Sequence, residues 1–401
     1  MPDEHRKKVF LALFLSIFSA MLGMGIIAPL MPIYASALGA GGFSLGVVFA
    51  MFAVSRTLFM PMTGRLSDRY DRKLFIATGL LIYALASVGY IWAGSVIQLI
   101  WIRLLHGIGS AMVIPIAAAY IGDISPEGQE GRMMGGFQVA MFTGFGFGPL
   151  MGGVLGDVFG IPPAFCLMGA FSIVAWILVV FLLPADGRGL RHKKQRQKAT
   201  PFRTLSRSDS FKGLMLFRSI NAAARGVLIV FLPVVAYNLE FRSSEIGILL
   251  SFNLLVTAVL QHYFGKVADR SYRPGLVVLG NAITGLSIFL ILVARTRFDF
   301  FLVSLIMGVG GGIAFPAAGA MATELGRKHG MGNIMGWFNT GQSLGQVAGP
   351  VFAGWIMDLF GIPCVFISVG LISILGCAIF GIWLHRDTHR MKKRSGDEQI
   401  F

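Results

Sequence analysis

Twelve apolar segments constrain this chain more than any other feature of its sequence. Each runs for about 19 to 28 residues with few charges, and a helix of about 20 apolar residues is long enough to cross the ~30 Å hydrocarbon core of a bilayer. The sequence therefore predicts an all-α membrane protein with twelve transmembrane helices. The segments are 9–36, 44–63, 74–94, 96–121, 133–156, 163–184, 214–237, 245–264, 276–294, 300–322, 333–357 and 363–385.

The composition fits lipid as the solvent for most of the surface. Of 401 residues, 55% are hydrophobic and 13% are charged, whereas soluble domains carry roughly 25% charged residues. The first segment follows three basic residues, as in a signal peptide. Its apolar run from Val9 to about Tyr34 is longer than the roughly 7–15 residues of a signal-peptide core, so we interpret it as the first span.

A basic segment, 185–213, separates two groups of six spans. It predicts a cytoplasmic linker between an N-terminal bundle, 1–184, and a C-terminal bundle, 214–401, which ends in a cytoplasmic tail. With the N-terminus inside, 27 of the 34 Lys and Arg residues lie on the inner side and 3 on the outer side. Because basic loops remain cytoplasmic, the net charge of +15 indicates the topology of a plasma (inner) membrane protein and does not require nucleic acid as a partner.

The two groups of spans repeat one another at a constant offset of 201 residues. Glycines, prolines and charged residues recur in the same order over about 100 residues. This pattern predicts two pseudo-symmetric six-helix bundles with a binding site between them. The matching positions are Gly64, Asp68 and Arg69 with Gly265, Asp269 and Arg270; Gly107, Gly109 and Pro115 with Gly308, Gly310 and Pro316; Gly148-Pro149 with Gly349-Pro350; and Asp157–Pro162 with Asp358–Pro363.

Four motifs give the chain its resemblance to the major facilitator superfamily. They are the loop Gly64–Lys73, the fourth-span segment Arg103–Gly109, the fifth-span segment Gly144–Gly153 and the first-span segment Leu22–Pro32. The last two resemble those of its twelve-span drug–proton antiporters. The resemblance covers nearly the whole chain and implies a secondary transporter that works by alternating access between two six-helix halves.

The loop motif implies a conformational latch. In the family, the equivalent of Asp68 faces the cytoplasmic start of the eleventh span, here near Gly332, and a carboxylate is favourable at a helix N-terminus. Asp71 replaces the usual glycine, and because Asp tolerates positive φ better than most residues, we expect the turn to survive. The predicted latch residues are Gly64, Asp68, Arg69, Arg72, Gly265, Asp269 and Arg270.

A second set of residues is predicted to form a hinge or a tight helix contact. Glycines let two helix backbones approach closely, and an interior proline removes one backbone donor and bends the helix. A bending hinge and ordinary tight packing remain open as interpretations. The residues are Pro29, Pro32, Gly144, Gly148, Pro149, Gly152, Gly153, Gly349 and Pro350.

Polar residues within the spans are candidates for substrate binding or proton coupling, because each charge in a membrane is costly and is usually functional. His106 replaces the Gln that the fourth-span motif often has. The amides could instead form interhelical hydrogen bonds, and Arg218 could reach the membrane surface. The candidates are Arg103, His106, Gln138, Arg218, Asn221, Arg225, Asn339, Gln342, Gln346 and Asp123.

No Asp or Glu lies in the middle of a predicted span, so Asp68, His106 or Asp123 would have to carry a coupled proton. We find no nucleophile–base set, phosphate loop or metal-ligand cluster, and the three cysteines lack ligand-like spacing. The sequence therefore predicts a monomeric transporter without catalytic residues, cofactor or metal, which exports amphiphilic small molecules with protons as a candidate coupling ion. An importer or exchanger of organic anions or sugars is the alternative, and a membrane receptor or enzyme is the alternative of another class.

The charge asymmetry gives a first testable prediction. In a variant without the native cysteines, a cysteine introduced at Gly41 should react with an impermeant thiol reagent added to intact cells, whereas one at Ser208 should react only after the cells are permeabilised. The physical reason is that basic segments such as 185–213 are retained on the cytoplasmic side. Labelling at Ser208 in sealed cells would reverse the predicted orientation.

Overall fold

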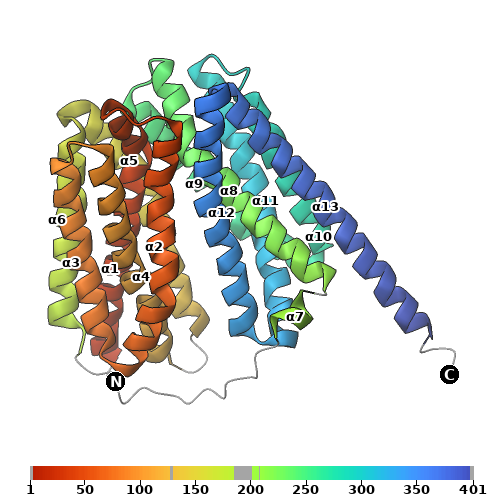
Figure 1. Cartoon of the computed structure of the whole chain (residues 1–401). Coiled ribbons are helices and arrows are strands. Elements are labelled where there is room, and N and C mark those ends of the chain that lie inside the picture. Colours follow the sequence, from red (N-terminus) through yellow and green to blue (C-terminus); the bar gives the residue numbers. More distant parts are fainter. Residues whose placement is uncertain (1–2, 127–129, 185–200, 207, 398–401) are drawn as a thin grey trace. The chain divides into compact units, whose positions relative to one another are not determined.

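Helices make up nearly all of the described chain. The computed structural model describes residues 3–126, 130–184, 201–206 and 208–397, and these ranges contain thirteen α-helices and no strands (Figure 1). The prediction of an all-α protein is confirmed. The helices are α1 (Asp3–Ala37), α2 (Gly42–Arg69), α3 (Arg72–Trp92), α4 (Val96–Ile124), α5 (Glu130–Phe159), α6 (Ile161–Leu182), α7 (Phe202–Leu205), α8 (Asp209–Asn238), α9 (Ser243–Arg270), α10 (Arg273–Leu290), α11 (Arg297–His329), α12 (Met331–Phe360) and α13 (Ile362–Asp397).

Eleven of the described helices, all except α7 and α12, are long and apolar enough to cross a membrane. The hydrocarbon core of a membrane contains no water to bind backbone N–H and C=O groups, and a helix pairs these groups within itself. The remaining long helix, α12, has 30 residues and corresponds to the predicted span 333–357. It is less apolar because it contains many glycines together with Asn339, Gln342 and Gln346.

Contacts within the chain define two units. The first comprises residues 1–194 and 229–254, and the second comprises 195–228 and 255–401. These units divide α8 after Leu228 and α9 after Leu254, so they do not follow the predicted continuous halves, whose boundaries stay a prediction. Helix α8 begins at Asp209, inside the predicted linker 185–213, of which 185–200 and 207 lie outside the described residues.

The repeated Asp-x-Phe-Gly-Ile-Pro segment forms the same helix junction twice. Gly160 separates α5 from α6 with φ 83°, and Gly361 separates α12 from α13 with φ 82°. Positive φ is readily accessible to glycine, and the proline that follows sits in the first turn of the next helix, where its missing N–H has no partner to lose. The two short junctions therefore follow directly from the sequence.

The glycines of the fifth-span motif hold α5 against α1. A Cβ at Gly148 would lie 2.5 Å from the Cα of Gly25, and one at Gly144 would lie 2.6 Å from the carbonyl oxygen of Phe18. Such distances leave no room for a side chain. At this interface the motif therefore acts as a tight backbone contact between the two helices.

The second unit repeats this contact between α8 and α12. A Cβ at Gly345 would lie 2.1 Å from the carbonyl oxygen of Ser219, and one at Gly349 would lie 2.6 Å from the Cα of Ala223. Gly345, Gly349 and Ser219 are each 201 positions after Gly144, Gly148 and Phe18, and Ala223 is the counterpart of Leu22, whose carbonyl oxygen would lie 2.6 Å from a Cβ at Gly148. The repeat therefore encodes the same helix pair in both units.

A substitution in the α1–α5 contact gives the second prediction. Gly148→Val should lower the thermal stability of the detergent-solubilised protein, because overpacking a close contact costs about 1–3 kcal/mol. The matched control is Gly135→Val on the same helix, where an added Cβ would meet nothing within 4 Å. Equal melting temperatures for Gly148→Val and the control would show that the backbones are not in tight contact.

Candidate functional site

An ionic cluster joins the adjacent ends of α2, α3 and α4. Arg72, the first residue of α3, places Nη2 3.2 Å from Oδ1 of Asp68 at the end of α2. Its Nη1 donates a hydrogen bond to Asp123 near the end of α4. The Arg72 side chain is 19% exposed, so these charges are partly shielded from solvent. One guanidinium therefore fixes the α2–α3 turn to α4.

The second unit contains the same cluster at repeat-related positions. Nη1 of Arg273 lies 3.0 Å from Oε2 of Glu324, and its Nη2 lies 4.0 Å from Oδ1 of Asp269. Arg273 begins α10, and Glu324 lies in the last turns of α11. The repeat therefore places an equivalent ionic cluster in each unit.

The turn at Asp71 forms as expected, but without the positive φ that a position usually occupied by glycine suggested. Its φ is −75°, and its side chain accepts a hydrogen bond from the Lys73 N–H at 2.9 Å. Asp is among the preferred residues for capping a helix N-terminus in this way. The aspartate therefore starts α3 as an N-cap, and a glycine conformation is not needed.

The remaining latch residues lie at the surface of their own units. Arg69 and Arg270 are exposed. A Cβ added to Gly64 or Gly265 would meet nothing within 4 Å. Their predicted latch role, like the predicted contact of Asp68 with the start of α12, stays a prediction.

Arg103 lies inside the first unit, where α4 packs against α2. The residue is 5% exposed to solvent. The Nε atom donates to the carbonyl oxygen of Val48 at 3.2 Å, and the guanidinium lies 5.0 Å and 4.7 Å from the ring centres of Phe49 and Phe52. Backbone and ring contacts of this kind stabilise a buried cation.

His106 is buried one turn further along α4 and is surrounded by aromatic rings. Its Nδ1 is 3.1 Å from the Tyr90 hydroxyl, and its ring centre is 4.6 Å from that of Tyr83 and 5.2 Å from that of Phe52. Tyr83 and Tyr90 belong to α3 and Phe52 to α2. The histidine therefore ties three helices of the first unit together.

The second unit holds a different basic group, on α8. The Nη2 atom of Arg218 donates a hydrogen bond to Oε1 of Gln342 on α12. The same guanidinium lies 4.5 Å from the ring centre of Phe338 and 5.8 Å from that of Phe315. Its Nε atom is buried and has no hydrogen-bond partner.

Arg225, on the same helix, shares one of these phenylalanine rings with Arg218. Its guanidinium lies 4.3 Å from the ring centre of Phe315 on α11. The structure thus brings together three predicted candidates, Arg218, Arg225 and Gln342, around two phenylalanines. The other predicted residues differ in exposure: Asn221 is buried, Gln346 is half-buried, and Gln138 and Asn339 are exposed.

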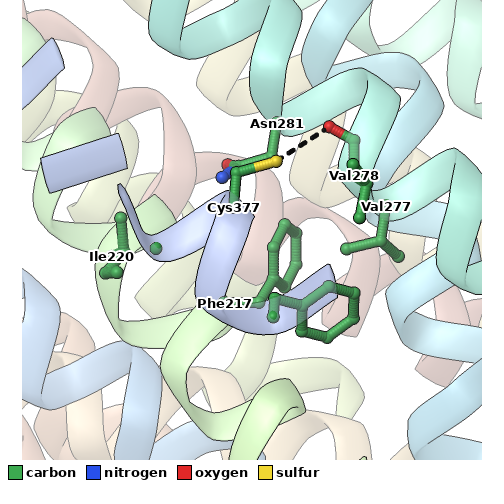
Figure 2. Close-up of a pocket in the computed structure, with 8 residues that line it drawn as sticks. Phe217, Ile220, Val277, Val278, Asn281 and Cys377 are labelled. Carbon is green, nitrogen blue, oxygen red and sulfur yellow. Dashed lines mark hydrogen bonds between the residues drawn. The ribbon is translucent and has the colours of Figure 1, made fainter. Parts of the chain in front are cut away.

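Figure 2 shows a narrow apolar gap elsewhere in the second unit. Its lining includes Phe217 of α8, Val277 and Asn281 of α10, and Cys377 of α13. The polar groups already have partners: the Cys377 thiol donates to the carbonyl oxygen of Val278 at 3.2 Å, and the Asn281 amide donates to that of Ser373 at 3.2 Å. No predicted site residue lines this gap, which fits helix packing.

A further carboxylate caps α9 within the first unit. Asp157, near the end of α5, accepts hydrogen bonds from the N–H groups of Ser243 at 2.8 Å and Ser244 at 2.9 Å. An acid at a helix N-terminus is stabilised by the helix dipole. The signal for this residue was its place in the repeated segment Asp157–Pro162, which we used only as evidence of the repeat.

A family model decides what kind of protein this is. The model of the Major Facilitator Superfamily matches residues 13–219 and again residues 214–400. The two matches begin at the same offset of 201 residues that relates the two ionic clusters. The chain belongs to the major facilitator superfamily. It is a multi-pass membrane transporter and not an enzyme.

Individual relatives agree with this assignment along the whole chain. An uncharacterized MFS-type transporter of Methanocaldococcus jannaschii is 32% identical over 381 residues, covering 92% of this chain and 98% of its own. Multidrug resistance protein 2 of Bacillus subtilis is 27% identical, covering 95% and 96%. The fold resembles a crystal structure of a bacterial homologue of the human lysosomal transporter Spinster in an inward-facing, unoccupied conformation, with a TM-score of 0.85, 17% identity and coverage of 96% and 98%.

Three residues in contact with the candidates were missed in the sequence. Glu324 is the repeat counterpart of the candidate Asp123, and Arg273 could have been found in the same way from Arg72. Phe315 and Phe338 gave no signal, because the chain has 34 phenylalanines and an isolated ring in an apolar span looks like packing.

The ionic clusters give the third prediction. Asp68→Asn and Arg72→Gln should each lower the transport rate about two- to fivefold, the effect of losing a charge contact worth ~0.3–1 kcal/mol in one conformation. Expression and equilibrium substrate binding should change little. Arg65→Gln, an exposed arginine on α2, is the matched control. Wild-type rates in the Asp68 and Arg72 variants would refute the role of this cluster in the transport cycle.

Proposed function

We propose that this transporter exports amphiphilic small molecules by alternating access, in exchange for protons. The observation that carries the proposal is the end-to-end relationship with a protein named for multidrug resistance, 27% identical over 396 residues. The fifth-span glycine motif, which resembles that of drug–proton antiporters, supports the same direction of transport. In this chain it forms the backbone contact between α1 and α5.

Proton exchange requires a group whose protonation differs between two conformations. Asp123 is the best placed of the three candidates, because its carboxylate is ion-paired with Arg72 at the end of α4. In a conformation without the Arg72 contact, this carboxylate would be free to bind a proton. His106 has a buried aromatic environment, and Asp68 is more exposed.

An exchanger or importer of organic anions is the second candidate function. The Arg218–Arg225 group on α8 favours it, since two cations on one helix attract an anion and repel a cation. The two functions overlap for an anionic amphiphile but differ in direction. For both functions we expect a monomer, and we expect both termini in the cytoplasm, which is the orientation that the basic loops predict.

Everted membrane vesicles provide the decisive experiment, and the fourth prediction. The vesicle lumen is acidified, and no inwardly directed substrate gradient is applied. A fluorescent amphiphile should then accumulate inside vesicles that contain the protein, and protons should leave the lumen as the amphiphile enters. Protein-free vesicles are the control. Accumulation that persists after collapse of the pH gradient would contradict proton exchange, and movement in the opposite direction would favour the import alternative.

A further inference from the structure

Two arginines share one face of α8 in the second unit. Arg218 and Arg225 are seven residues apart, which is about two helical turns, so their side chains project on the same side. Both guanidinium groups lie beside the same ring, that of Phe315 on α11, at 5.8 Å and 4.3 Å from its centre. The two positive charges are therefore held in one small region.

No acidic side chain neutralises these charges among the residues that the structure describes. Arg218 forms one side-chain hydrogen bond, to Gln342, and its buried Nε has no acceptor. Arg225 has the Phe315 ring as its contact. A cation within a membrane span is costly unless an opposite charge lies next to it. The two guanidinium groups therefore have both the charge and the hydrogen-bond donors to bind an anion.

Helix packing does not explain why arginine occupies these positions. The repeat-related residues in the first half, 201 positions earlier, are Ile17 and Met24, and Gln342 corresponds to Met141. The ionic clusters and the glycine contacts recur in both units, whereas this group does not. The basic group on α8 is therefore not part of the framework that the two halves share.

Arg103 gives a useful contrast within the same chain. Its guanidinium is also surrounded by phenylalanines, but its Nε donates to a backbone carbonyl and the residue is 5% exposed. Arg218 and Arg225 are both more exposed. Their planar guanidinium groups retain donors suited to a carboxylate, which they can grip with two parallel hydrogen bonds.

We propose that Arg218 and Arg225 form an anion subsite of the transporter, which binds the head group of an amphiphilic monoanion. Phe315 and Phe338 bind its apolar portion, and Gln342 orients Arg218. This inference rests on the proposed transport of amphiphiles and names the class of substrate: amphiphiles with a carboxylate or sulfonate group are preferred over neutral analogues, and permanent cations are excluded.

The test, and the fifth prediction, is binding to the purified full-length protein in a neutral maltoside detergent. The probes are a dansyl-labelled undecanoic acid and its methyl ester, which differ in charge and little in size. The wild-type protein should bind the acid about tenfold more tightly than the ester, as expected for a charge-assisted hydrogen bond. Arg218→Ala and Arg225→Ala should each remove most of this preference while leaving the affinity for the ester nearly unchanged.

Two further variants separate recognition from structure. Arg225→Lys should keep part of the preference, since lysine keeps the charge but lacks the planar fork. Arg327→Ala, which removes an exposed arginine from α11, is the matched control and should behave as the wild type. A wild-type protein without preference for the acid, or an Arg225→Ala variant that weakens acid and ester equally, would overturn the subsite.

Two further measurements ask whether the bound anion is a lipid or a substrate, and whether a negative result contradicts the anion subsite alone or the export function as well. Phosphatidylglycerol added to the micelles should compete poorly with the acid; strong displacement that phosphatidylcholine does not reproduce would assign the arginines to lipid and overturn the substrate site. Transport of the ester at the rate of the acid would refute the subsite but leave the proposed export function intact. If vesicles accumulate neither probe nor any other amphiphile, the export function itself fails.

Discussion

The requirement that every backbone N–H and C=O find a partner without water underlies the whole structure. Helices meet it within themselves, which is why the described chain contains no strands. Lipid provides little hydrophobic drive for one helix to pack on another, so close contact between small residues takes over that role. The backbone contacts at Gly148 against α1 and at Gly349 against α8 are two instances of one solution.

Duplication separates the parts of this transporter that maintain the fold from those that serve one half. The ionic clusters centred on Arg72 and Arg273 lie at equivalent positions and join equivalent helix ends. The charged residues within the spans do not recur: Arg103 corresponds to Ser304, and His106 to Met307. Each unit thus carries its own polar group on a common helical framework.

The two polar groups differ in how closely the protein encloses them. In the first unit, Arg103 and His106 are enclosed by the carbonyl oxygen of Val48 and by rings from α2 and α3. In the second unit, Arg218 and Arg225 are more exposed than Arg103, and the Nε atom of Arg218 has no hydrogen-bond partner. Arg103 is therefore enclosed within the packing of its unit, whereas the more exposed Arg218 and Arg225 are the pair that we propose binds an anion.

The sequence by itself determined the spans, the repeat and the family, because these depend on apolar length and on residues at fixed spacing. It also selected Arg218, Arg225 and Gln342 as polar residues within spans, but could not show that they meet around Phe315 and Phe338. Only the tertiary structure decided this, and it placed Arg103 within the α2–α4 contact instead. The reason is physical. The period of the α-helix, about 3.6 residues per turn, fixes which residues share a face, whereas packing between segments distant in the chain sets what that face contacts.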